Sequence, residues 1–215
     1  VARIRFKCTG TECSDGNPST DDSASRIVLI FGGGYDTNQD NSITPGADSM
    51  GNAIYIVDPL TGARLWWASN TTASDSDRAQ LELANMKYSV PSELTLMDAN
   101  SDGSTDRIYV SDTGGQIWRI DLNSQIDTDT NGGSSGYVFA DVGCDGGVRS
   151  NDCFATSNQK RRKFFYPPDV AQVNDPNFSA SANYDLVTIA SGNREDPLDL
   201  LTTNLSPVQE AVHNR

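Results

Sequence analysis

The chain has 215 residues and a formal net charge of −13, from 29 acidic and 16 basic side chains. Because a nucleic-acid backbone is bound by basic patches, this balance argues against nucleic acid as a partner. No apolar run approaches the roughly 18 residues that a membrane-spanning helix requires, and we predict no transmembrane segment.

Short apolar runs bounded by turn residues predict an all-β fold. Each run is rich in Ile, Val, Tyr, Phe and Trp, and Gly, Asn, Asp, Ser or Pro lie at its ends. Helical periodicity is weak, with a short helix expected in Ser76–Tyr88 and another turn or two in Pro207–His213. In chain order, the predicted strands are Arg26–Phe31, Ala53–Val57, Arg64–Ala68, Glu93–Met97, Arg107–Val110, Gln116–Ile120, Tyr137–Ala140, Lys163–Tyr166 and Asp185–Ala190.

Four cysteines lie in two polar loops that have little apolar core of their own. We favour the local disulfides Cys8–Cys13 and Cys144–Cys153 among the three possible pairings, and hence an oxidising compartment. Four free thiols in a cytosolic protein remain the alternative. Residues 1–26 are then predicted to be a disulfide-bearing N-terminal loop segment, and residues 27–215 the β-domain. With no initiator methionine before Val1, we expect a segment of a longer protein.

An internal repeat indicates how the strands are organised. Ile54–Trp66 is similar to Ile108–Trp118: each has an apolar strand, a turn with Asp and Gly, and a strand that ends in Trp. Hairpins that recur about every 50 residues are typical of β-propeller blades. We therefore predict a modified β-propeller with long loops, and a partial ring of about four blades.

The loop Asp98–Asp106 (DANSDGSTD) is the strongest candidate for a functional site. It has oxygen-bearing side chains at alternate positions and a glycine where the chain must turn. Ca²⁺ takes six to eight oxygen ligands, and it would relieve the repulsion among the three carboxylates. We predict a Ca²⁺ site in which Ser104 contributes its backbone carbonyl and the side-chain ligands are Asp98, Asn100, Asp102 and Asp106. The alternative is an acidic surface turn.

Two further loops are weaker candidates for a metal site. The first begins as an EF-hand loop does but lacks its closing Glu; its candidate ligands are Asp36, Asn38, Asp40, Ser42 and Asp48. The second shows alternate oxygens before a glycine, in Asp127, Asp129 and Asn131, and then enters a Gly/Ser-rich stretch. Solvated loops are the alternative for both.

Several strings in the chain together resemble the C-terminal propeller of the PilY1 family of type IV pilus assembly and tip proteins. The resemblance runs from about Ile27 to Arg194. It rests on the Asp-rich loop, on the hairpin that follows the loop, and on flanking motifs. These are Phe31–Asp36 (FGGGYD), Gly51–Asp58 (GNAIYIVD), Met86–Ser92 (MKYSVPS), Asp112–Asp121 (DTGGQIWRID), Phe164–Val170 (FFYPPDV) and Ile189–Arg194 (IASGNR).

The resemblance implies an exported protein at the pilus tip, the cell surface, or the periplasm and outer membrane. It implies Ca²⁺ bound by Asp98, Asn100, Asp102, Ser104 and Asp106, and a role of that ion in pilus extension and retraction. Surface attachment is the further function expected. The expected partners are other pilus components, such as minor pilins, together with host or abiotic surfaces.

No catalytic constellation is present in the sequence, and we predict a non-enzymatic module. His213 is the one histidine, and no GxSxG motif occurs. Two other functions remain as alternatives. The hairpin Asp58–Trp66 also resembles the blade repeat of quinoprotein dehydrogenases, and exposed Trp66, Trp67 or Trp118 would suit a carbohydrate-binding propeller.

Overall fold

The computed structural model describes residues 1–7, 23–40, 47–70, 79–122, 126, 134–143, 162–174 and 183–192. The described chain is all-β, as the sequence predicted, apart from the short 3₁₀ turn η2 at Thr37–Gln39. Its strands are β1 Ala2–Lys7, β2 Ser23–Gly32, β3 Ala53–Val57, β4 Arg64–Ser69, β5 Leu81–Glu82, β6 Thr95–Met97, β7 Arg107–Ser111, β8 Gln116–Leu122, β9 Ser134–Asp141, β10 Asp169–Asn174 and β11 Asn183–Thr188.

The strands form two sheets of the size of a propeller blade and one two-stranded sheet. The first sheet has the order β1-β2-β3-β4-β5, and the second has the order β6-β7-β8-β9. Consecutive strands pair antiparallel within each sheet, except that β4 and β5 are parallel. An up-and-down sheet of about four strands is the unit from which a propeller is built. The described residues thus form part of a modified β-propeller.

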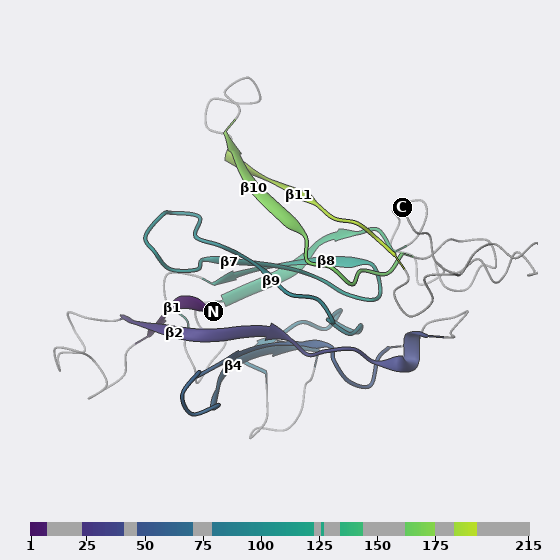
Figure 1. The fold of residues 1–215 in the computed structure, drawn as a ribbon, viewed down its shortest axis with the longest axis horizontal. Coiled ribbons are helices and arrows are strands. Elements are labelled where there is room, and N and C mark those ends of the chain that lie inside the picture. The colour runs from purple at the N-terminus through teal and green to yellow at the C-terminus, as the bar shows by residue number, and fades with distance from the viewer. Residues whose placement is uncertain are drawn as a thin grey trace, which may run out of the picture.

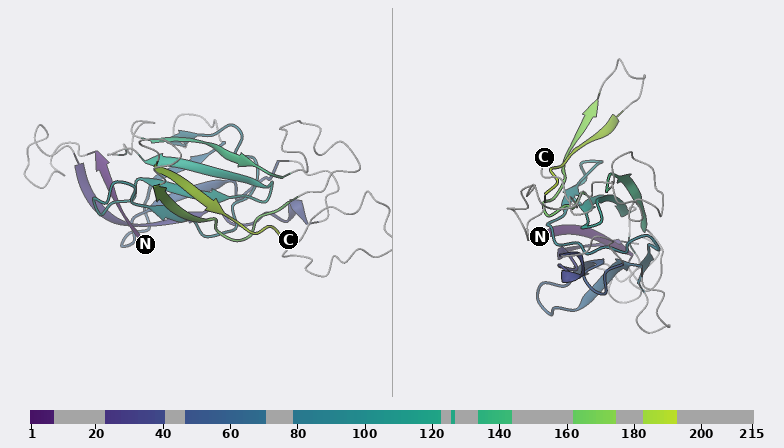
Figure 2. Two further views of the ribbon diagram at one scale, coloured as in Figure 1. Left: turned by 90° about the horizontal axis from the view of Figure 1, so that it is seen from above. Right: turned by 90° about the vertical axis from the view of Figure 1, so that its right-hand side faces the viewer.

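A single apolar core joins the two larger sheets. Figure 1 shows them as two layers, with β2 and β4 in one and β7, β8 and β9 in the other. The inward faces meet through fully buried side chains from both layers, among them Ile54, Ile56, Trp66, Ile108 and Trp118. The two-stranded sheet β10–β11 stands away from these layers, most clearly in the right-hand view of Figure 2.

The predicted internal repeat is confirmed as two equivalent antiparallel hairpins, β3–β4 and β7–β8. In the first turn, the Asp58 carboxylate accepts the backbone N–H groups of Leu60 and Thr61 at 2.8 and 2.9 Å. In the second turn, Asp112 accepts those of Gly114 and Gln116, both at 2.9 Å. Each turn also has a glycine at positive φ, Gly62 at 72° and Gly115 at 84°. The Asp-and-Gly signal in the sequence therefore specified both turns.

Two predictions of secondary structure are wrong. Lys163–Tyr166 is not a strand: the backbone of Phe164 bonds to Asp112 and that of Lys163 to Gly192, so its partners do not form a ladder. The predicted helix Ser76–Tyr88 is absent from its described part, residues 79–88, where β5 and turns lie instead. Its apolar residues Leu81 and Leu83 alternate into the core as in a strand.

Besides β5, the strands β1 and β10 were not predicted from the sequence. β1 pairs with β2 from Ala2↔Val28 to Lys7↔Ser23, and β10 pairs with β11. The described ends of the predicted N-terminal loop segment therefore belong to the first sheet, and residue 26 lies inside β2. All four cysteines, Cys8, Cys13, Cys144 and Cys153, and the predicted turn Pro207–His213 lie outside the described residues.

Among the described residues, no helix has the length and apolar composition needed to cross a membrane.

Candidate metal centre

The loop Asp98–Asp106 joins β6 to β7 and is described throughout. It is closed at its base by the N–H of Asp106, which donates to the carbonyl of Met97 at 2.9 Å. Two residues inside it have left-handed backbone, Ser101 at φ 63° and Gly103 at φ 85°. Glycine adopts that conformation without a Cβ penalty, so Gly103 allows the chain to fold back over Asp98.

Asp98 is the centre around which the first half of the loop wraps. Its Oδ1 accepts the N–H of Asp102 at 3.1 Å, and its Oδ2 accepts the N–H of Gly103 at 2.8 Å. The side-chain oxygen of Asn100 also accepts the N–H of Asp102, at 2.9 Å. The side-chain oxygens of Asp98 and Asn100, two of the predicted ligands, thus meet at the backbone N–H of Asp102, the third.

Asp102 and Asp106 organise the second half of the loop. Asp102 Oδ1 accepts the N–H of Ser104 at 2.9 Å, and this bond is the main reason that the pKa of Asp102 lies below its ordinary value. Asp106 Oδ2 accepts the N–H groups of Ala99 and Asn100 at 2.8 and 3.2 Å. Asp106 therefore ties the end of the loop to its beginning.

The donor set fits Ca²⁺ in chemistry and in spacing. Counting Asp98 as position one, oxygen ligands stand at positions one, three, five, seven and nine, and Gly103 occupies position six, as in the first part of an EF-hand loop. Among the described residues, no three acidic, His or Cys side chains are already gathered around one point. The carboxylates are turned toward loop amides. Each oxygen of Asp98, and Oδ1 of Asp102, accepts one loop amide and so has a second lone pair that could bind a cation.

One contact to this loop was not foreseen from the sequence. Arg5 of β1 places Nη2 3.3 Å from Asp102 Oδ2, across 97 positions of chain. The backbone of β1 also meets this region, because the N–H of Thr105 donates to the carbonyl of Arg3 at 2.8 Å. The loop of the second sheet thus rests on the edge strand of the first sheet.

In the second candidate loop, Asp36 is already saturated with donors. It is 3% exposed, and its carboxylate accepts hydrogen bonds from Asn38 N and Nδ2 and from Ser49 N and Oγ, and one more from Met50 N. The Asn38 amide is the chief cause of its lowered pKa. Asp40 accepts the phenolic O–H of Tyr35. Ser42 lies outside the described residues.

Asp48, the last candidate in that loop, joins the two sheets. It is 7% exposed, and its Oδ2 accepts the N–H of Ser89 at 2.6 Å and the hydroxyl of Thr113 at 3.2 Å. Thr113 lies in the β7–β8 turn, so the carboxylate bridges a loop of the first sheet to the second sheet. Asp36 and Asp48 organise the backbone here. Asp127, Asp129 and Asn131 of the third candidate loop lie outside the described residues.

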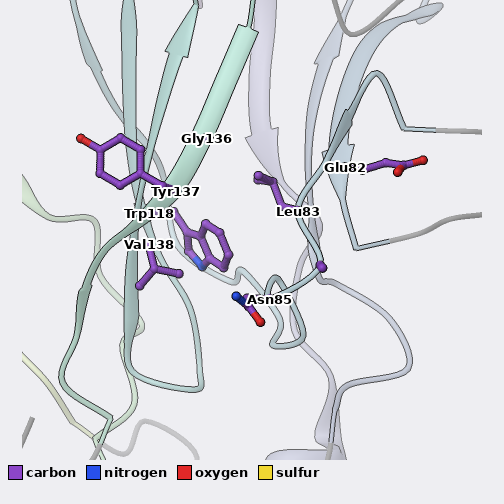
Figure 3. A pocket seen from close by; sticks show the side chains of 8 residues that line it. Glu82, Leu83, Asn85, Trp118, Gly136, Tyr137 and Val138 are labelled. Carbon is purple, nitrogen blue, oxygen red and sulfur yellow. The ribbon is translucent and has the colours of Figure 1, made fainter. Parts of the chain in front are cut away.

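A groove of about 350 Å³ lies between the turn after β5 and the strands β8 and β9. Figure 3 shows Trp118, Leu83 and Asn85 near its centre, whereas the carboxylate of Glu82 points away. The carbohydrate-binding alternative rested on exposed tryptophan rings that could stack against a sugar. Trp66, Trp67 and Trp118 are only 0%, 6% and 2% exposed, so the exposed tryptophans of the carbohydrate-binding alternative are not present.

The fold and this loop together define an all-β, propeller-like protein with an acidic candidate cation site. No protein-family model matches the chain, and no curated protein matches it. A search of solved structures found the crystal structure of the Pseudomonas aeruginosa PilY1 C-terminal domain, with a TM-score of 0.43 and 16% sequence identity. The match covers 83% of this chain and 37% of that chain. This chain thus corresponds to well under half the length of that structure.

Proposed function

We propose that the chain is a calcium-binding β-propeller module of a type IV pilus assembly or tip protein. Calcium in the loop Asp98–Asp106 would regulate pilus extension and retraction and support surface attachment. The observation that carries this proposal is the geometry of the loop. Asp98 accepts the amides of positions five and six, and Gly103 supplies the left-handed turn at position six.

The motifs around the loop support the pilus part of the proposal. The β7–β8 hairpin that follows it contains the string Asp112–Asp121, and its turn is built on the buried Asp112. We propose an exported location, at the pilus tip, the cell surface, or the periplasm and outer membrane. The partners would be minor pilins and other pilus components, with host or abiotic surfaces beyond them. The module itself would be non-enzymatic.

Calcium, when bound, would supply the positive charge that three close carboxylates lack. The protein's own residues would hold the loop in place. Asp98 and Asp106 hold the loop closed on its backbone amides, and Thr105 fastens it to the β1 edge of the first sheet. The loop therefore lies at the contact between the two larger sheets, which we call the seam: the place where the β6–β7 loop meets β1. A change in the loop could alter a surface to which both sheets contribute.

Titration calorimetry of chelator-treated protein with CaCl₂ tests the calcium part of the proposal. We expect saturable binding with a Kd on the order of micromolar to millimolar, and much weaker binding of Mg²⁺. Asp102→Ala should abolish or strongly weaken it. Asp58→Ala is the matched control, because Asp58 also accepts two amides in an exposed turn but has no alternating ligands around it. Equal affinity in the wild type and Asp102→Ala would refute this site.

Pilus association needs a separate measurement, since a calcium loop can occur in many exported proteins. Calcium-dependent capture of purified minor pilins by the wild-type chain, lost in Asp102→Ala, is the expected result. If capture is the same with and without calcium, and the same in the wild type and Asp102→Ala, calcium does not have the proposed regulatory role. Appearance of a quinone chromophore after reconstitution would instead favour the dehydrogenase alternative.

A further inference from the structure

Arg5 contacts Asp102, so a cation bound by the loop would compete with the Arg5 guanidinium for the Asp102 carboxylate. In β1, Ile4 and Phe6 point into the core at 1% and 2% exposure, so Arg3 and Arg5 alternate onto the opposite face. From that face, the Arg5 guanidinium reaches Asp102 Oδ2 at 3.3 Å. Asp102 occupies position five of the loop, one of the predicted ligand positions.

The backbone keeps Arg5 close to the loop whatever its side chain does. The carbonyl of Arg3 accepts the N–H of Thr105 at 2.8 Å, and the carbonyl of Arg5 accepts that of Ile126 at 3.0 Å. Phe6 and Ile126 form an isolated parallel bridge at the same place. β1 is thus held between β2 and segments of the second sheet, and the guanidinium remains within reach of Asp102.

The two oxygens of Asp102 have different partners. Oδ1 accepts the loop amide of Ser104, whereas Oδ2 faces the arginine. A divalent cation coordinated by Asp102 would lie within a few ångströms of a second full positive charge, and like charges at that separation repel strongly. Occupation of the loop and the Arg5–Asp102 ion pair are therefore mutually unfavourable.

We propose that Arg5 is a built-in competitor for the cation site: it pairs with Asp102 in the metal-free loop, and calcium displaces it. This inference rests on the calcium-binding function proposed above. β1 belongs to the first sheet and the loop to the second. Binding of calcium would therefore break an ion pair that joins the two sheets, the one between Arg5 and Asp102. The backbone bonds of Arg3 and Arg5 to the second sheet persist in both states.

Calcium titration of Arg5→Gln against Arg3→Gln tests the proposal. Both variants lose one positive charge on the same face of β1, but only Arg5 contacts Asp102 among the described residues. Loss of a partly exposed ion pair is expected to tighten calcium binding in Arg5→Gln roughly two- to fivefold. Arg3→Gln should change the affinity by less than about twofold, since its charge acts only through solvent.

A second comparison isolates the contact itself. In an Asp102→Asn background the carboxylate is gone, so adding Arg5→Gln should leave whatever calcium affinity remains unchanged. The difference in calcium affinity between the wild type and Arg5→Gln should also become smaller as salt is raised from about 0.05 to 0.5 M, because salt screens the ion pair. Circular dichroism confirms that each variant is folded before titration.

The outcomes separate this inference from the proposed function. If the wild type binds calcium and Arg5→Gln binds it equally or more weakly, Arg5 is not a competitor but the calcium site stands. If Arg3→Gln and Arg5→Gln bind calcium more tightly by the same factor, the effect comes from the change in net charge, and the inference is also overturned. If neither the wild type nor Arg5→Gln binds, both ideas fall. Binding by Arg5→Gln alone would support both.

Discussion

Asp58 and Asp112 occupy the same place in two equivalent hairpins but differ in environment. Backbone amides, that of Thr61 foremost, hold the pKa of the partly exposed Asp58 below its ordinary value. Asp112 is fully buried, and burial raises its pKa to about 7 although Trp118, Gln116 and Gly114 all donate to it. The same turn signal in the sequence thus produces a partly exposed aspartate with a lowered pKa and a fully buried aspartate with a raised pKa.

The raised pKa of Asp112 predicts that stability falls as the pH rises from about 4 to about 7. The folded state binds the proton more tightly than the unfolded chain, so the contribution is complete below the unfolded pKa of about 4 and is lost as the pH passes the folded value near 7. The size is on the order of 2–4 kcal/mol. Urea unfolding of the wild type and Asp112→Asn across this range measures it.

The slope should be much smaller in Asp112→Asn and unchanged in Asp58→Asn, the matched variant of the other turn. The pKa of Asp58 is lowered, so its contribution is present above pH 4 and is lost only in more acidic solution. A slope that survives in Asp112→Asn would assign the pH dependence to another group.

The two hairpin tryptophans predict a second contrast. The indole N–H of Trp118 donates to Asp112 Oδ2 at 2.9 Å, whereas the buried indole N–H of Trp66 has no hydrogen-bond partner in the described structure. Trp118→Phe removes a donor from a buried carboxyl and also loses packing, while Trp66→Phe loses packing alone. We expect Trp118→Phe to destabilise the protein by about 1–3 kcal/mol more than Trp66→Phe in urea unfolding. Equal losses would show that the bond to Asp112 contributes little.

At the scale of elements, the hairpins were predictable and the isolated segments were not. β3–β4 and β7–β8 carry apolar strands, an Asp turn and a glycine at positive φ, so local signals agree with the final pairing. Lys163–Phe165 has the composition of a strand and is buried, yet its backbone bonds go to separate segments. Burial of an apolar run is visible in the sequence, but the absence of a neighbouring strand is not.

The hairpin β10–β11 is attached to the second sheet by a charged cluster. Asp185 of β11, with a side chain 5% exposed, accepts the O–H of Tyr109 at 2.5 Å and pairs with the guanidinium of Arg107. Arg119 lies 3.8 Å from the same carboxylate, and Asp121 bonds both arginines. Burial and the bond to Asp185 raise the pKa of Tyr109, so the phenol stays protonated as a donor.

Removing this charge should loosen β10–β11 without unfolding the two larger sheets. In Asp185→Asn, we expect the amides of β10 and β11 to exchange with deuterium roughly ten- to a hundredfold faster, because hydrogen bonds to a charged group each contribute about 1.5–3 kcal/mol. The amides of β3 and β7 should be unaffected. Asp169→Asn, at an exposed position of β10, is the control and should leave exchange unchanged. Uniformly faster exchange across the chain would mean that the hairpin unfolds with the whole molecule.

At the scale of the whole molecule, the residues of the candidate loop could be picked out from the sequence, but their neighbours in the structure could not. The loop residues Asp98, Asn100, Asp102 and Asp106 are close in sequence, so their spacing alone predicts a candidate set of ligands. Arg5 comes from a strand 97 positions away, and no local pattern links it to Asp102. The alternation Arg3-Ile4-Arg5-Phe6 does signal a strand, but its place beside the loop follows only from the packing of the two sheets.

The position of the loop at the seam predicts how calcium affects the stability of the whole chain. An ion that binds the folded state alone stabilises it by mass action, by about 2.7 kcal/mol when free calcium is 100 times Kd. We therefore expect calcium to raise the melting temperature by several degrees, chelator to reverse the rise, and Asp102→Ala to show neither effect. Because the loop bonds to β1 through Thr105 and Arg3, both sheets should melt together at the higher temperature. Hydrogen exchange at individual amides distinguishes the two sheets. If calcium stabilises only the second sheet, the loop does not couple the two sheets.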